Sequence, residues 1–223
     1  MNITHAIHEE VTGDKLEAIF KRQSELMFKY HDIEKRSGLL QTEDCPVNLD
    51  DKRGQARIKD FAWRVTEEVG EALDAYRSRD DEHFHEELID GLHFLTELSI
   101  LAGITPKEIV QNLVDSIPTL PTDAAKDKDC LDSIYELAQI QIYLDGAITA
   151  FVESIGMMCN CLKNKPWKQS NMVTDKKAFY KRLSNLWSSY ISVLATANLS
   201  PEEVVDVYLK KSQVNKFRQR SNY

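Results

Sequence analysis

Apolar side chains recur every three or four residues along most of the chain, which is the spacing of one face of an α-helix. In the first half this pattern predicts helices over residues 14–36, 55–79 and 82–102. Gly103 closes the third of them, because glycine is the residue that most often follows a helix end. A short fourth helix begins after Thr105, a capping residue, with Pro106 in its first turn and Glu108 completing a capping box.

The second half of the chain continues the helical pattern after a linker. Residues 117–129 contain two prolines and several aspartates and predict an irregular connection. Residues 130–162 are strongly apolar and predict one long helix, placed either in the core or at a subunit interface. Residues 163–174 form a basic loop with one tryptophan, and two further helices are expected over residues 175–197 and 200–218.

We expect an all-α fold, a multi-helix bundle, because no segment shows sustained alternation of apolar and polar residues. Glycine (8) and proline (6) are scarce among the 223 residues, which disfavours a turn-rich β-sandwich. The length suits a single domain over residues 1–223. Within it, we expect residues 1–116 to form a core that carries the acidic helices. Residues 117–223 would form a helical lobe with a basic C-terminal segment.

Charge and composition narrow the class of protein. The formal net charge of −8 argues against broad binding to nucleic acid, which needs a basic face. No uncharged apolar stretch approaches the roughly 20 residues of a membrane span, and the polar N-terminus shows no signal-peptide pattern. The cysteines lack a metal-binding spacing, so free thiols in a cytoplasmic protein are expected. They are Cys45, Cys130, Cys159 and Cys161.

Acidic residues on the second and third predicted helices form the clearest chemical pattern. Glu67, Glu68 and Glu71 follow an EExxE spacing, and Glu87 and Asp90 follow an ExxD spacing. Residues three apart lie on one helical face, and the short break between the two helices makes them antiparallel neighbours. The carboxylates of Glu68, Glu71, Glu87 and Asp90 can then converge. Hard oxygen ligands of this kind suit Mg²⁺ or Mn²⁺.

Two plainer interpretations stay open at this point. An acidic stripe on a helix is usually a solvated surface, and a non-enzymatic helical scaffold could use such stripes to bind a partner protein. The same two segments are strongly apolar at Val65, Val69, Leu88 and Leu92, however. These residues place part of each stripe near a buried seam and favour the metal site.

Two segments together resemble a known family. One is the run from Glu87 to Phe94 (ELIDGLHF), and the other is the run from Tyr208 to Tyr223 (YLKKSQVNKFRQRSNY). They are similar to the all-α nucleoside triphosphate pyrophosphohydrolases, the superfamily that includes MazG-like enzymes. The likeness is greatest to the dimeric dUTPases and the phage dCTPase-dUTPases. It covers the first predicted helix, residues 63–94 and residues 208–223, while the rest matches only in helical character.

The resemblance implies a catalytic four-helix core with additional C-terminal helices, and a hydrolase that depends on Mg²⁺, with Mn²⁺ as a substitute. Its substrate would be a pyrimidine deoxynucleoside triphosphate, dUTP first and dCTP second, cleaved to the monophosphate and pyrophosphate. A broad-specificity house-cleaning pyrophosphatase is the alternative within the superfamily. The resemblance also implies a homodimer, and the compact form is similar to the phage members.

Taken residue by residue, the resemblance makes the four convergent carboxylates the catalytic magnesium ligands. Glu68 would also orient or deprotonate the attacking water. Gln23 corresponds to the glutamine that reads the pyrimidine base, although the asparagine that usually follows it is missing here. His93 is either a partner that orients a ligand or a core histidine.

The C-terminal segment supplies further implied contacts with substrate. Lys211, Asn215 and Arg218 lie near one face at helical spacing and would contact the phosphates. Tyr223 is the closing tyrosine of the family pattern, preceded by Asn222 where the family has glycine.

The basic loop is expected to replace a missing motif. The dimeric dUTPases carry a stretch rich in tryptophan and lysine between their two acidic motifs, and this chain does not. We expect Trp167 to cover the base or sugar instead, with Lys165 and Lys168 near the phosphates.

Overall fold

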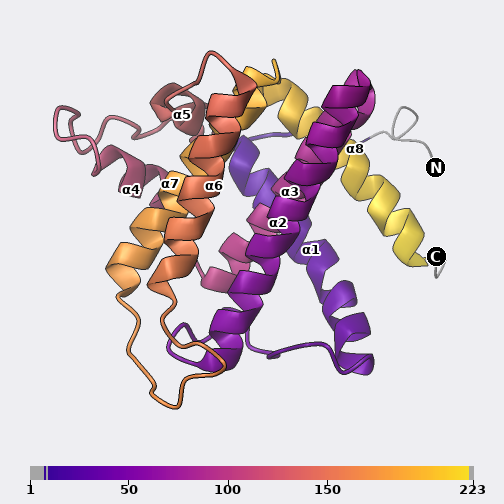
Figure 1. The fold of residues 1–223 in the computed structure, drawn as a ribbon. Helices are drawn as coiled ribbons and strands as arrows, with labels where there is room; N and C mark the ends of the chain where they lie inside the picture. Colours follow the sequence, from indigo (N-terminus) through magenta and orange to yellow (C-terminus); the bar gives the residue numbers. More distant parts are fainter. Residues whose placement is uncertain (1–7, 9, 221–223) are drawn as a thin grey trace.

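The computed structural model describes residue 8 and residues 10–220, and these form α-helices without a β-strand (Figure 1). The all-α prediction is therefore confirmed. The helices are α1 (Lys15–Arg36), α2 (Lys52–Ser78), α3 (Asp81–Ala102), α4 (Pro106–Val114), α5 (Cys130–Leu137), α6 (Leu144–Cys161), α7 (Lys176–Thr196) and α8 (Pro201–Arg220). The four cysteines are free thiols, as expected.

Helices α2 and α3 form the antiparallel pair that the acidic motifs require. Arg79 ends α2 in the left-handed conformation, with a φ of 60°, and Asp80 caps α3 by accepting a hydrogen bond from the His83 amide. This tight turn folds α3 back along α2. The seam between the helices is apolar, with Val65 and Leu88 both fully buried. The two acidic stripes therefore face each other beside a rigid contact.

Helix α7 contacts α3 through two buried hydrogen bonds. The Tyr190 hydroxyl donates a hydrogen bond of 2.6 Å to the backbone oxygen of Leu88. The Trp187 indole donates one of 2.9 Å to the Ser99 hydroxyl. Both aromatic side chains are fully buried. Because Leu88 lies between Glu87 and Asp90 in the sequence, α7 fixes the height and rotation of the ExxD turn.

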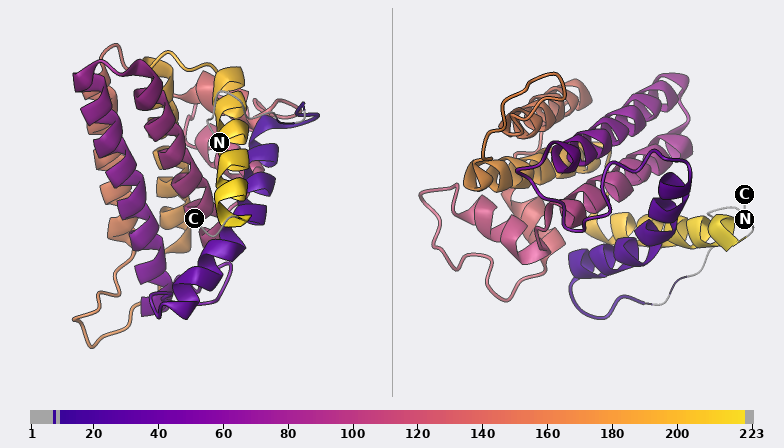
Figure 2. Two further views of the ribbon diagram at one scale, coloured as in Figure 1. Left: turned by 90° about the vertical axis from the view of Figure 1, so that its right-hand side faces the viewer. Right: turned by 90° about the horizontal axis from the view of Figure 1, so that it is seen from below.

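Helices α1 and α8 pack against each other and against α3. The right-hand view of Figure 2 shows the α2–α3 pair between this α1–α8 pair and the α6–α7 pair. One continuous buried apolar cluster reaches into every helix from α1 to α8. Residues separated by most of the chain, such as Gln23 and Tyr208, therefore meet in the interior.

The start of α1 and the start of α5 are tied together by a reciprocal exchange of caps. Asp14 caps α1 and also accepts a hydrogen bond of 2.7 Å from the Cys130 amide in α5. Asp129 caps α5 and accepts one of 2.7 Å from the Lys15 amide in α1. Each aspartate thus satisfies backbone donors that the first turn of a helix leaves without partners.

The single helix predicted over residues 130–162 is wrong, because residues 138–143 separate α5 from α6. Side-chain hydroxyls of α7 form hydrogen bonds with the backbone groups of this extended break. Ser192 accepts from the Gln141 amide and donates to the Gln139 oxygen, and Thr196 donates to the Gln141 oxygen. The apolar content of the segment was therefore a poor guide, since side chains of another helix stabilise the irregular backbone.

No single helix among the described residues is long and apolar enough to span a membrane, although α3 and α4, bent by 90°, pass the same test as a pair.

Replacement of Gly91 tests whether α7 fixes the ExxD turn. A Cβ at Gly91 would collide with the Tyr190 hydroxyl. We expect Gly91→Ala to lower the free energy of unfolding by about 1–3 kcal/mol, the usual range for overpacking. Gly156→Ala is the matched control, because Gly156 is exposed on α6 and no atom lies near its Cβ position. Alanine there should stabilise the protein by about 0.5–1 kcal/mol in urea unfolding. Equal effects at both glycines would contradict the close contact.

Candidate active site

Three of the predicted ligands come together between α2 and α3, two to three helical turns from the connection of the two helices. Carboxylate oxygens of Glu68, Glu71 and Glu87 all lie within 4.8 Å of one another. Glu87 is buried, Glu68 is half-buried and Glu71 is exposed, so the cluster reaches from the helix seam to the surface. The i, i+3 spacing in α2 and the antiparallel turn produce this arrangement.

The acidic groups of the cluster lie close enough to repel one another. Burial, a hydrogen bond with Glu87 and the charges of Asp90, Glu87 and Glu71 raise the pKa of Glu68 to about 8. A carboxyl with such a pKa keeps a proton at neutral pH, which relieves the repulsion between the acidic groups. His83 supplies a further polar contact, with its Nδ1 at 3.1 Å from Glu87. A divalent cation would relieve the same repulsion.

The fourth predicted ligand, Asp90, contacts a lysine. The Lys211 ammonium on α8 lies 2.8 Å from Asp90 and 2.6 Å from Glu86. Burial lowers the pKa of Lys211, but Asp90 and Glu86 outweigh it and hold the pKa above its usual value. Burial raises the pKa of Asp90 to about 6 despite this partner. Lys211 is itself buried, so α8 brings a fixed positive charge to the edge of the cluster.

A cleft of about 320 Å³ opens next to the carboxylates and is lined by α1, α2, α3 and α8. Glu68 and Asp90 line it at the acidic cluster, together with Asn215 from α8. Apolar side chains also line it, among them Leu26 and Phe94. The cleft thus combines an acidic region with apolar walls, as a site for a small molecule with charged and planar parts requires.

Gln23 lies in this cleft within a buried hydrogen-bond network. Its carbonyl oxygen accepts from the Tyr208 hydroxyl and contacts His93 Nδ1, each at 2.9 Å. Its amide nitrogen donates to Glu97 at 2.7 Å. The His31 ring nitrogen lies 2.9 Å from the other oxygen of Glu97. The structure therefore places the predicted base-reading glutamine beside the carboxylate cluster and orients it firmly.

His93 is a buried neutral histidine in this network. Burial, reinforced by the charge of Lys211, lowers its pKa to about 3. Its ring stacks on the Tyr208 ring with the centroids 3.8 Å apart. With Nδ1 as the donor to Gln23, its Nε2 is an acceptor for which the described residues offer no hydrogen-bond partner. The residue thus orients Gln23 rather than a carboxylate ligand.

Sequence reasoning missed several residues of the cleft. Glu97 lies seven residues after Asp90, on the same face of α3 two turns further, and this spacing was its only signal. Glu34 on α1 accepts hydrogen bonds from Arg57 at 2.5 Å and from Arg64 at 2.6 Å. Glu34 and Arg64 line the cleft. The pairing of α1 with α2 that brings them together is not visible in local sequence.

The remaining predicted contacts on the C-terminal segment differ in position. Asn215 lines the cleft, and its contact with phosphate stays a prediction. Arg218 is exposed on the last turn of α8, where its charge acts on Tyr30, a residue of the cleft wall. Tyr223 lies outside the described residues.

The basic loop lies against the start of α2 and contributes no side chain to the cleft lining. The buried Asn164 donates to the backbone oxygens of Asp50 and Met172, which anchors the loop there. The Lys52 amine donates to the Lys168 oxygen, and Trp167 is 77% exposed. The structure therefore does not bring the predicted contacts Lys165, Trp167 and Lys168 to the carboxylates.

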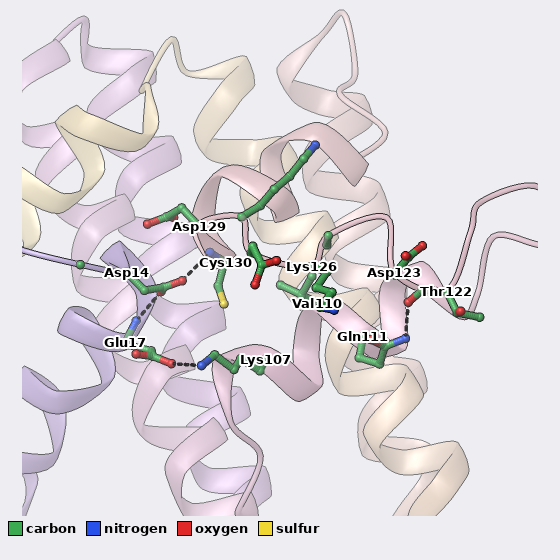
Figure 3. A pocket seen from close by; sticks show the side chains of 14 residues that line it. Asp14, Glu17, Lys107, Val110, Gln111, Thr122, Asp123, Lys126, Asp129 and Cys130 are labelled. Carbon is green, nitrogen blue, oxygen red and sulfur yellow. Dashed lines mark hydrogen bonds and ion pairs between the residues drawn. The ribbon is translucent and has the colours of Figure 1, made fainter.

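A larger pocket, about 720 Å³, lies elsewhere, where the start of α1 faces α4 and residues 122–130 (Figure 3). Several of its charged groups have structural roles. Asp14 and Asp129 cap helices, and Glu17 pairs with Lys107 at 3.2 Å. The smaller cleft at the carboxylates is therefore the candidate active site.

The pKa of His93 predicts a specific pH dependence of stability. The unfolded chain binds a proton near pH 6.5 whereas folded His93 does so near pH 3, so stability is present above 6.5 and falls as the pH drops towards 3. Between pH 6.5 and 5 the wild type should lose about 1.5 kcal/mol more than His93→Asn, which keeps a donor for Gln23. Chemical denaturation at several pH values measures the difference. Parallel pH profiles would show that His93 protonates freely in the folded protein.

Comparison with known protein families identifies the family of the chain. A family model described as dUTPase matches residues 15–223, which includes both acidic helices and α8. The comparisons with curated proteins and with solved structures found no match. The match sets aside the interpretation as a non-enzymatic scaffold. The chain therefore belongs to the all-helical dUTPase family and is an enzyme of the dUTP diphosphatase type.

Proposed function

We propose that the protein hydrolyses dUTP to dUMP and pyrophosphate with Mg²⁺ held by Glu68, Glu71, Glu87 and Asp90. The observation that carries this proposal is the carboxylate cluster, with oxygens within 4.8 Å of one another, at the edge of a 320 Å³ cleft. Family membership supports dUTP hydrolysis at the level of the family. The magnesium requirement rests on the donor set.

The donor set fits magnesium. Mg²⁺ prefers oxygen ligands such as carboxylates. Glu68, Glu71 and Glu87 offer three such oxygens within 4.8 Å of one another and would hold the ion. A cation would also remove the repulsion that raises the pKa of Glu68. When bound, Mg²⁺ would neutralise phosphate oxygens and stabilise the negative charge that develops during hydrolysis.

Glu68 is the candidate for the residue that orients and deprotonates the attacking water. Of the three clustered carboxylates, it alone is among the residues that line the cleft. A water molecule held there would lie next to the α-phosphate of a nucleotide whose phosphates face the cluster. Attack at that phosphorus releases pyrophosphate as a unit.

Lys211 and Asn215 are the candidates for contacts with the phosphates. The Lys211 ammonium already lies at Asp90, where it offsets a buried negative charge. From the edge of the carboxylate cluster this ammonium would pair with phosphate oxygens. Asn215 lines the cleft and can donate a hydrogen bond.

The homodimer, the use of Mn²⁺ and the cytoplasmic location stay predictions from the sequence.

A product assay with dUTP, dCTP, dTTP, dATP and dGTP tests the proposal. Each nucleotide is supplied with Mg²⁺ and with a chelator, and pyrophosphate and monophosphate are measured. We expect magnesium-dependent cleavage of dUTP with the purine nucleotides spared. Equal cleavage of all five would instead place the protein among the broad-specificity pyrophosphatases, and no cleavage of dUTP would overturn the proposal.

Replacement of Glu68 tests its catalytic role. We expect Glu68→Gln to lower kcat by at least about 100-fold, the usual contribution of a positioned general base, while the fold is kept. Glu67→Gln is the matched control, because Glu67 is exposed and accepts a hydrogen bond only from Trp63 among the described side chains. It should leave kcat within about twofold of the wild type. Similar kcat values for both variants would show that Glu68 is not the base.

Replacement of Lys211 tests the phosphate contact. A hydrogen bond to a charged group contributes about 1.5–3 kcal/mol, so Lys211→Gln should raise KM for dUTP by about 10- to 100-fold. Lys210→Gln is the control, because the neighbouring lysine pairs with Asp206 instead. An unchanged KM in Lys211→Gln would restrict this lysine to a structural contact with Asp90.

A further inference from the structure

We propose that Glu97 accepts the N3 hydrogen of the uracil base and thereby sets the preference of the cleft for dUTP over dCTP. This inference rests on the proposed function, because it places a nucleotide in the same cleft. Glu97 would provide the discrimination between uracil and cytosine that Gln23 alone does not provide.

The Gln23 carbonyl oxygen has no acceptor capacity left. A carbonyl oxygen has two lone pairs. One accepts the Tyr208 hydroxyl and the other accepts His93 Nδ1, each at 2.9 Å. The ring N3–H of uracil needs an acceptor, so Gln23 cannot serve this group in the arrangement observed.

Glu97 also fixes which end of the Gln23 amide faces it. A carboxylate only accepts hydrogen bonds, so the Gln23 atom at 2.7 Å from Glu97 must be the amide nitrogen. This leaves Gln23 with one free N–H, which can donate to a carbonyl oxygen of a base. The free N–H of Gln23 and the Glu97 carboxylate are therefore an adjacent donor and acceptor.

Glu97 is 4% exposed and lines the cleft. Its two oxygens form hydrogen bonds with Gln23 and His31. Each carboxylate oxygen has a further lone pair. A buried carboxylate that is held from two sides presents a rigid acceptor, which discriminates between ligands more sharply than a mobile one.

The position of Glu97 suits the base end of a nucleotide. On α3 it lies seven residues beyond Asp90, which is about 10 Å along the helix axis. Apolar residues of the cleft wall, Leu26, Ile33 and Phe94, can pack against a planar ring. Phosphates at the carboxylate cluster would then leave the base near Gln23 and Glu97.

The donor–acceptor pair matches the imide edge of uracil. The Gln23 N–H would donate to the O4 atom, and Glu97 would accept from the neighbouring N3–H. Cytosine in the same position presents an amino group to the Gln23 donor and a bare N3 acceptor to the carboxylate. It would fit only if turned over, so that its amino group met Glu97 and its N3 met Gln23, which phosphates anchored at the cluster oppose. An unpaired buried group of this kind costs a site much of its affinity.

The experiment measures binding of α,β-imido analogues of dUTP and dCTP in the presence of Mg²⁺ by calorimetry. These analogues are not cleaved at the bond in question, so the measurement does not depend on turnover. If the protein hydrolysed no nucleotide, the proposed function would fail while the base preference could still be read. The wild type should bind the dUTP analogue at least about tenfold more tightly than the dCTP analogue.

Glu97→Gln is the decisive variant. We expect it to weaken binding of the dUTP analogue by about 10- to 100-fold, to weaken the dCTP analogue far less, and to reduce the preference to below about threefold. Glu25→Gln is the control, because this exposed carboxylate on α1 pairs with Lys216 outside the cleft lining. Its preference should equal that of the wild type.

Three outcomes would overturn the inference. Equal weakening of both analogues in Glu97→Gln would mean that Glu97 only supports the fold of the cleft. Unchanged binding of both would exclude a contact with the base. A wild type that prefers the dCTP analogue would mean that Glu97 accepts from the cytosine amino group instead.

Discussion

The carboxylates of Glu68, Glu71 and Glu87 lie within 4.8 Å of one another because the apolar seam between α2 and α3 holds their helices together. Burial of that seam pulls the acidic stripes towards each other, while like charges push them apart. Burial and the charges of the neighbouring carboxylates together raise the pKa of Glu68. In the proposed function, a divalent cation would offset this repulsion.

The surrounding helices hold the carboxylates and the cleft residues in position. On one side, α7 fixes the ExxD turn through the hydrogen bond from Tyr190 to the Leu88 oxygen. On the other side, α8 brings the Lys211 ammonium to Asp90 and the Tyr208 hydroxyl to Gln23. The cleft thus combines α1 and α8, from the two ends of the chain, with α2 and α3. The C-terminal helix contributes both to the charge balance at Asp90 and to the orientation of the Gln23 amide.

Local sequence patterns predicted the parts of this structure that depend on one helix at a time. The spacing of Glu68, Glu71, Glu87 and Asp90 was sufficient to place them on facing stripes. Capping residues marked the end of α3 and the start of α4. The resemblance to the dUTPases pointed to Gln23.

Features that depend on contacts between distant segments could not be predicted in this way. The hydroxyls of α7 stabilise the break at residues 138–143, and Asn164 anchors the basic loop far from the cleft. The contact between Glu97 and His31 likewise needs the packing of α1 on α3.

The most direct test of the proposed magnesium site compares thermal unfolding of the wild type and Glu68→Gln, each with chelator and with Mg²⁺. We expect Glu68→Gln to be at least as stable as the wild type in chelator and to lose most of the stabilisation by Mg²⁺. A variant that is less stable in chelator and responds fully to Mg²⁺ would contradict it.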